Sequence, residues 1–140
     1  MKSFKILLVA VLAVTSWHAV AQACNPREDA VCAYIISPEN GATVSSPVTV
    51  RFGLKGMGVA PAGVERGNTG HHHLLIDTEL PPLTKPVPTD GHHRHFGGGQ
   101  TEATIELNPG KHTLQLLLGD HFHVPHTPPV VSEKVTITVN

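Results

Sequence analysis

Histidines dominate the chemistry that this sequence offers. The chain has 11 histidines in 140 residues, and ten of them lie between residues 71 and 126. Nine of these ten form three dense clusters, Gly70 to His73, His92 to His95 and His121 to His126, and His112 lies alone between the last two. Neutral imidazole is the side chain that most readily binds transition metals near neutral pH. The clustering therefore predicts a metal site.

The spacing within the first cluster suits a site built on a strand. Residues i and i+2 of a strand point the same way, about 6 to 7 Å apart, so His71 and His73 can reach one ion while His72 faces the other side. Tetrahedral coordination then needs one or two ligands from other segments. The candidate ligands are the clustered histidines and one methionine: His71, His72, His73, His93, His95, His121, His123, His126 and Met57.

The methionine bears on which ion is expected. Met57 is the only methionine after the initiator, and it lies in a glycine-rich stretch. A thioether is a soft ligand that favours Cu(I). The sequence therefore favours copper, with zinc as the alternative. A methionine after a strand is also a common core residue, and this second interpretation of Met57 stays open.

The N-terminus has the pattern of an export signal. Residues 1–23 begin with two lysines, continue with an apolar run over residues 6–14, and end in the small-x-small cleavage pattern Ala21-Gln22-Ala23. The apolar run is too short to span a membrane as a mature helix. We expect a single domain of residues 24–140, periplasmic or secreted, with no membrane span.

The two cysteines, Cys24 and Cys32, fit an exported chain. In an oxidising compartment a short-loop disulfide between them is the expected state. The alternative is a lipid anchor on Cys24, because Ala21 to Cys24 loosely resembles a lipobox, although Ala21 stands where leucine is usual. Under either hypothesis the metal is held by histidine, methionine or carboxylate rather than by a free thiolate.

Composition argues against a nucleic-acid partner. Removing residues 1–23 leaves 8 basic and 11 acidic residues, a net charge of 8 − 11 = −3 with neutral histidines. There is no basic stripe, and aromatic residues make up only 4% of the chain. Both features differ from those of nucleic-acid-binding domains. The expected partners are a metal ion and a protein that exchanges it.

The rest of the chain alternates like β-strands. Ala103, Ile105 and Leu107 share one face of a predicted strand, and the turn Asn108 to Lys111 leads into the next strand. No helical period with caps follows the signal. We predict an all-β fold, a small antiparallel sandwich of immunoglobulin-like or cupredoxin-like type. Its expected strands are residues 33–37, 48–54, 71–77, 101–107, 112–118 and 133–139.

An immunoglobulin-like strand order determines which clusters can meet. It brings to one end of the sandwich the connection that holds Met57, the start of strand 71–77, the segment His92 to His95 just before strand 101–107, and the connection His121 to His126. His112 falls at the opposite end and is expected to be structural. The order predicts one metal site at the shared end.

Several segments resemble known families. Ser37 to Val44 is similar to the start of many bacterial immunoglobulin-like modules. Four further segments together resemble a family of small exported bacterial domains catalogued as a domain of unknown function, over roughly residues 35–140. The resemblance implies an exported β-domain and no established activity. These segments are Gly56 to Gly63, Gly70 to Asp77, His95 to Glu102 and Pro109 to Leu114.

Two other functions remain open. Clustered imidazoles can form a pH-responsive patch for an anionic partner without metal. His71-x-His73 with Glu79 and the later His112 resembles the two motifs of a cupin barrel, which would make a small metalloenzyme. The sequence has no metalloprotease, serine-hydrolase or phosphate-loop motif, so a non-enzymatic binder is favoured. Asp77 and Asp120 are expected at strand ends, where either can also orient a ligand imidazole.

Overall fold

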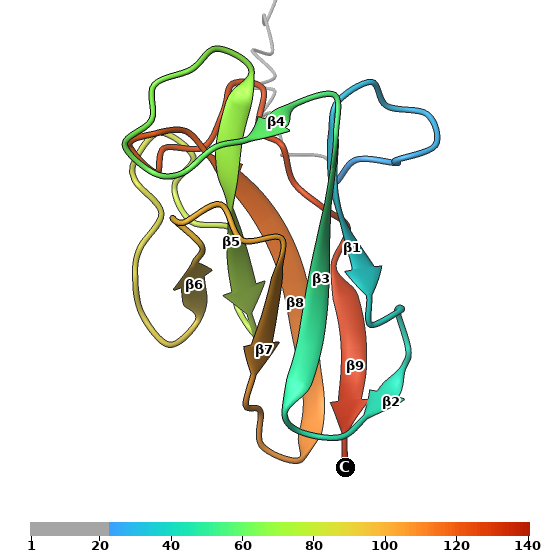
Figure 1. Cartoon of the computed structure of the whole chain (residues 1–140). Helices are drawn as coiled ribbons and strands as arrows, with labels where there is room; N and C mark the ends of the chain where they lie inside the picture. The colour runs from blue at the N-terminus through green and yellow to red at the C-terminus, as the bar shows by residue number, and fades with distance from the viewer. Residues whose placement is uncertain (1–22) are drawn as a thin grey trace, which may run out of the picture.

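The computed structural model describes residues 23–140, so the predicted export signal lies outside the described residues apart from its last position. Two β-sheets face one another (Figure 1). Among the described residues no helix is long and apolar enough to cross a membrane. The strands are β1 (Cys32–Ser37), β2 (Thr43–Val44), β3 (Val48–Lys55), β4 (Gly58–Val59), β5 (Thr69–Ile76), β6 (His93–His95), β7 (Glu102–Ile105), β8 (Gly110–Gly119) and β9 (Val135–Val139).

The sheet orders confirm the predicted sandwich. One sheet has the order β1-β3-β7, and the larger sheet has the order β2-β9-β8-β5-β4, with β6 also paired to β5. The pairs β1–β3, β3–β7, β5–β8 and β8–β9 are all antiparallel. The sheets do not close into the barrel that the cupin hypothesis requires.

The main core fills the space between the sheets. Val50 and Phe52 of β3 meet Leu74 of β5 and Leu116 of β8 there, in one buried cluster. Side chains alternate between the two faces along a strand. Because Leu74 points into the core, His72 and Ile76, two residues away on either side, also point inward. His71, His73 and Leu75 of the same strand must then lie on the outer face of the larger sheet.

A second, smaller core covers part of that outer face. Leu75 and Leu117 pack there against Val87 and Val131, which come from the two long connections after β5 and β8. In Figure 1 both connections run alongside β5 and β8. The outer face is therefore partly closed by irregular chain, which is the setting in which buried histidines can occur.

The segment around residues 92–95 differs from the prediction. It was expected as a connection before the strand at 101–107, and it instead forms β6, antiparallel to β5, with Leu74 opposite Arg94. Without β6, the backbone N–H and C=O groups on this edge of β5 would be unpaired, and β6 forms the hydrogen bonds that satisfy them. Pairing to β5 determines where the second histidine cluster lies.

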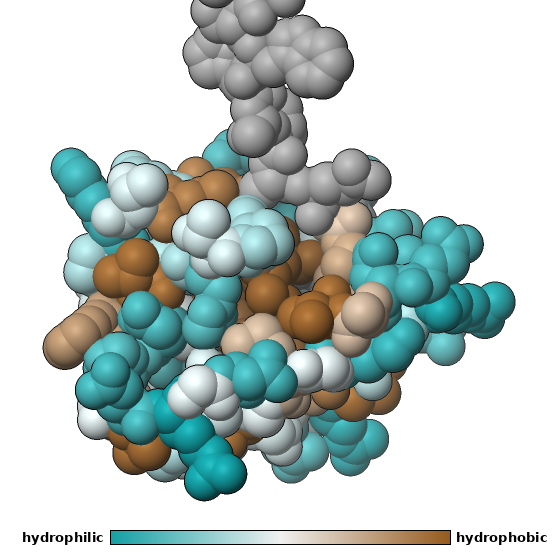
Figure 2. Space-filling view, turned by 90° about the horizontal axis from the view of Figure 1, so that it is seen from above, coloured by the Kyte–Doolittle hydropathy of each residue, from teal (hydrophilic) through white to brown (hydrophobic). Residues whose placement is uncertain are grey.

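The predicted disulfide joins Cys24 to Cys32. It ties the first described residues to the start of β1. A lipid anchor on Cys24 would need the same sulfur atom that this bond uses. The end of the sandwich nearest to these residues carries hydrophobic side chains grouped among hydrophilic ones (Figure 2).

Candidate metal centre

Two histidines of β5 form the base of the site. His71 and His73 are fully buried on the outer face of the larger sheet. Their partners across the ladder in β8 are Gly119 and Leu117. A Cβ at Gly119 would lie 2.6 Å from Cε1 of His73, closer than side chains can approach. Glycine at this position therefore leaves the space that the His73 ring occupies.

A third histidine comes from β6. The register places His95 directly opposite His73, and the two ring centroids are 5.0 Å apart. Facing residues of an antiparallel pair have their side chains on the same face of the sheet, 4.5 to 5.5 Å apart at Cβ in general. The pairing of β5 with β6 is thus sufficient to bring His95 to the outer face beside His73.

The fourth histidine is held by a tight turn after β8. His123 has a φ of 67°, in the left-handed region. The Asp120 carboxylate stabilises the turn by accepting hydrogen bonds from the backbone N–H groups of Phe122 (2.8 Å) and Val124 (3.0 Å). The N–H of His123 donates to the carbonyl of Asp120 at 2.9 Å. This turn directs the His123 ring back toward β5.

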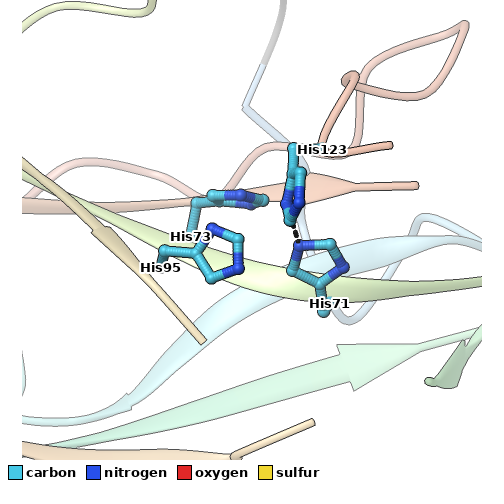
Figure 3. Close-up of side chains that lie close together, drawn as sticks. All are labelled: His71, His73, His95 and His123. Atoms are coloured by element: carbon cyan, nitrogen blue, oxygen red, sulfur yellow. Dashed lines mark hydrogen bonds between the residues drawn. The ribbon is translucent and has the colours of Figure 1, made fainter. Parts of the chain in front are cut away.

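The four rings meet at one point. His71, His73, His95 and His123 each offer a ring nitrogen, and these atoms all lie within 4.8 Å of one another. Nε2 of His71 and Nδ1 of His123 are 2.9 Å apart and share a hydrogen bond (Figure 3). Elements far apart in the sequence, β5, β6 and the turn after β8, supply the set.

Burial leaves several of these nitrogens without partners. Among the described residues, Nδ1 of His71 and both ring nitrogens of His73 are buried and make no hydrogen bond. Leaving a buried polar group unpaired costs about 1 to 3 kcal/mol. A metal ion at the centre of the set would supply the missing interaction to one nitrogen of the His73 ring. The donor set therefore fits an ion of the class that imidazole prefers.

The electrostatics keep the rings in the form that binds metal. Burial, followed by the nearby His123 and His95, lowers the pKa of His71 to about 4. Burial, followed by the neighbouring His71 and His95, lowers the pKa of His73 to about 3. Burial also lowers the pKa of His95. Because only neutral imidazole coordinates a metal, these rings are available to an ion across the whole range near neutrality.

His72 and Met57 lie on the other side of the sheet from the four-histidine cluster. His72 is fully buried between the sheets, with its ring centroid 5.3 Å from that of Phe52. Met57 packs against the main core. Of the two interpretations of Met57, the structure thus supports packing, and the four-histidine cluster has no thioether that would favour Cu(I).

Three other candidate histidines lie near the cluster without joining it. Nδ1 of His93 hydrogen-bonds to the Asp90 carboxylate at 2.9 Å. His121 and His126 line a neighbouring cavity, which also contacts His71. The ring of His121 packs against that of Phe122, with centroids 4.0 Å apart and the ring planes tilted by 41°. None of the three belongs to the set of four.

His112 is structural, as the sequence predicted. Its Nδ1 donates to Oδ2 of Asp77 at 2.6 Å, and its Nε2 donates to the carbonyl of Asn108 at 2.8 Å. Oδ1 of Asp77 accepts from the N–H of Thr113 at 2.7 Å. Asp77 therefore stabilises the start of β8 through its hydrogen bonds to His112 and Thr113, and it does not orient a residue of the four-histidine cluster.

We predict that His112→Ala lowers stability without changing metal affinity. The hydrogen bond to Asp77, followed by that to Asn108, raises the pKa of His112. A raised folded-state pKa contributes stability that is present below the unfolded value of about 6.5 and disappears as the pH rises through the folded value. The loss is expected to be roughly 1 to 2 kcal/mol at pH 6 and smaller at pH 9. Urea unfolding at both pH values checks this, and a loss that grows with pH would contradict it.

Gly119 is the residue beside the four histidines that sequence reasoning missed, whereas Asp120 was expected at a strand end as a residue that can orient a ligand imidazole, and it lies in the turn that holds His123. We predict that Asp120→Ala weakens metal binding roughly 10- to 100-fold, the usual effect of losing a group that positions a ligand. Asp120→Asn keeps an oxygen that can accept the N–H groups of Phe122 and Val124, and it should retain most of the affinity. Metal titration of both variants tests this role of Asp120. Equal losses of metal affinity in the two variants would show that Asp120 does not act through the hydrogen bonds of the turn.

Residues 50–140 match the family described as Domain of unknown function (DUF4399). The match covers more than half of the chain, so the protein belongs to this family, and the family's description carries no activity. Neither the curated proteins nor the solved structures include a match to the chain.

Proposed function

We propose that this chain is an exported protein that binds one transition-metal ion through His71, His73, His95 and His123. The observation that carries the proposal is the convergence of four imidazoles from three separate elements within 4.8 Å. A tetrahedral ion with metal–nitrogen bonds of about 2.0 to 2.1 Å needs its ligand atoms about 3.3 Å apart. Small ring movements therefore bring the four nitrogens to bonding distance.

Copper is the ion that we propose, with zinc as the alternative. The affinity of a nitrogen site for divalent ions rises to Cu²⁺ and falls again at Zn²⁺. The four imidazoles contain no thiolate or thioether that would select Cu(I). The proposal of copper therefore rests on the preference of an imidazole set for Cu²⁺ and no longer on Met57.

Transport, storage or delivery of the ion fits the donor set better than catalysis. Catalytic zinc sites keep one of four positions open for water or substrate, whereas four protein ligands close a tetrahedral site. The disulfide between Cys24 and Cys32 supports a periplasmic or secreted location, where a metal-delivery protein would be the partner.

The pH-responsive patch is less well supported than the metal site. A histidine sensor must change charge between about pH 5 and 8. The pKa values of about 4 for His71 and about 3 for His73 keep both rings neutral over that range. Their charge would change only in more acidic conditions.

The test is a metal titration of the purified chain without a polyhistidine tag. We predict one Cu²⁺ or Zn²⁺ bound per chain, and the same stoichiometry and affinity in Met57→Leu, because leucine keeps most of the volume of Met57 in the core. Isothermal titration calorimetry with competing chelators measures both quantities. Binding of several weak ions per chain would argue for scattered surface histidines. A strong loss in Met57→Leu would return the thioether to the ligand set.

A further inference from the structure

The four-histidine cluster is closed on the side of His95. A Cβ at Gly97 would collide with Nε2 of His95, so the backbone of Gly97 packs directly against the His95 ring. The N–H of Ala62 donates to the carbonyl of Gly97 at 2.8 Å and holds this connection in place. The ring centroids of His95 and His123 are 4.3 Å apart, a separation at which two rings are in contact. A metal ion therefore cannot pass between these two rings unless one of them moves.

On the side of His71, a cavity of about 290 Å³ adjoins the cluster. Its outer lining, residues 64–68, is exposed, whereas Gly70 and His71 in its inner lining are buried. A water molecule takes up about 30 Å³ of liquid volume, so the cavity has room for an ion with several water molecules. His71 is the one residue that the cavity shares with the cluster. Its side chain is therefore the boundary between a solvent-facing space and the metal centre.

The charges of this cavity favour a cation. Its lining holds two carboxylates, Glu65 and Asp120, and one guanidinium, that of Arg66, so its net charge is negative. Burial is the largest influence on the pKa of His71 and of His126 and lowers both, and in both residues the charge of Asp120 acts in the opposite direction. A field that favours a proton on these rings also favours a metal ion beside them.

His121 adds an imidazole to the same cavity. Its ring is partly exposed, and its backbone carbonyl accepts a hydrogen bond from the N–H of Gly63 at 3.0 Å, which joins the two walls of the cavity. Among the described residues, the four-histidine cluster is the only group of three or more histidine, cysteine or acidic side chains close enough together to hold an ion. The cavity can therefore attract an ion and contact it through His121, but it cannot hold the ion as tightly as the cluster does.

A second cavity, of about 340 Å³, reaches the cluster at His95 and has a different charge balance. Its charged lining is one carboxylate, that of Asp90, and one guanidinium, that of Arg94. Oδ1 of Asp90 already accepts hydrogen bonds from Nδ1 of His93 and from the backbone N–H groups of residues 92 and 93. This second cavity therefore offers a cation no electrostatic advantage.

We propose that the metal ion enters and leaves the four-histidine cluster through the cavity beside His71, where the two carboxylates attract it and His121 binds it transiently. The His71 ring must turn to let the ion pass, because its Nδ1 is buried and its Nε2 shares a hydrogen bond with His123 (Figure 3). The inference rests on the proposed metal-binding function and adds the route by which a delivery partner loads or unloads the ion. A residue that acts only on this route changes the rates of binding and release by the same factor and leaves the affinity unchanged.

The test is stopped-flow mixing of the metal-free full chain with Co²⁺. Tetrahedral nitrogen coordination gives Co²⁺ a strong visible absorption, so the signal reports arrival at the cluster and not contact with the cavity. We expect His121→Phe to lower the association rate constant roughly ten-fold, the lower end of the range for effects of a charged cleft on association. Phenylalanine keeps a ring that can pack against Phe122 and removes both nitrogens. An equilibrium titration of the same variant should give the wild-type affinity for Co²⁺.

A matched pair of charge variants locates the route. Glu65→Gln and Asp90→Asn each remove one carboxylate from one of the two cavities, and they change the net charge of the chain by the same amount. We expect Glu65→Gln to slow Co²⁺ association about three-fold at low ionic strength and less at high salt, because salt screens an exposed charge. Asp90→Asn should retain the wild-type rate.

Three outcomes would overturn the route and leave the metal site intact. The first is a wild-type association rate in both His121→Phe and Glu65→Gln. The second is a larger loss of rate in Asp90→Asn than in Glu65→Gln, which would assign entry to the cavity at His95. The third is a loss of Co²⁺ affinity in His121→Phe as large as its loss of rate, which would make His121 a ligand of the bound ion. A wild-type chain that binds no Co²⁺, Zn²⁺ or Cu²⁺ at equilibrium overturns the proposed function itself.

Discussion

Replacing His73 by phenylalanine is expected to weaken Cu²⁺ or Zn²⁺ binding by at least about 100-fold, more than the loss of a positioning group costs. Phenylalanine keeps an aromatic ring and removes both nitrogens, so the space beside Gly119 stays filled. His73 has no hydrogen-bond partner among the described residues, and the substitution should not destabilise the metal-free protein. Chelator competition on the folded variant measures the loss.

The same substitution one residue earlier is the control. His72 is as deeply buried as His73, but it packs between the sheets against Phe52. His72→Phe should leave metal affinity unchanged and raise stability, because it removes two buried nitrogens that lack partners among the described residues. Equal metal affinities in the two variants would show that the outer face of β5 is not the binding face.

Acid should destabilise the metal-free protein strongly. The pKa values of His71, His72 and His73 are lowered to about 4, 4 and 3, in each case mainly by burial. The unfolded chain takes up protons on these residues below about pH 6.5, and the folded chain does so only below about pH 4. Stability therefore falls as the pH drops from 6.5 to 4. The slope approaches roughly 4 kcal/mol per pH unit when all three rings contribute.

Bound metal should counteract this loss. An ion that binds only the folded state stabilises it by about 4 kcal/mol at a free concentration 1,000 times the Kd, which corresponds to a rise in Tm of roughly 15 degrees. The protection should persist at pH 5 and disappear as the pH falls through about 4, the pKa of His71. Urea and thermal unfolding between pH 7.5 and 3.5, with and without zinc, measure both effects. A metal-free stability that is flat from pH 7 to pH 4.5 would contradict the burial of these rings.

Strand periodicity was sufficient to predict the sandwich. The apolar alternation around Val50, Ile105 and Leu116 is produced by burial on one face, and the same burial forms the main core. β6 was not predictable in this way. It has three residues, of which Arg94 is exposed and His95 only partly buried, so no apolar pattern identifies it. Its existence depends on pairing with the edge of β5, which a local pattern does not reveal.

The candidate site was predictable only where a strand determines side-chain direction. The i, i+2 spacing correctly put His71 and His73 on one face and His72 on the other. The choice of His95 over His93 depends on the register between β5 and β6, and the choice of His123 over His121 and His126 depends on a left-handed turn. Met57 lies in irregular chain just before β4, where periodicity carries no information on direction.

X-ray absorption spectroscopy of the chain loaded with one equivalent of Cu²⁺ or Zn²⁺ tests the central claim most directly. The account predicts four nitrogen scatterers at about 2.0 Å with the outer-shell pattern of imidazole rings and no sulfur. The spectrum of His73→Phe, loaded under the same conditions, should show fewer imidazoles. A wild-type spectrum with sulfur in the first shell, or one dominated by oxygen with one or two imidazoles, would contradict a four-histidine centre.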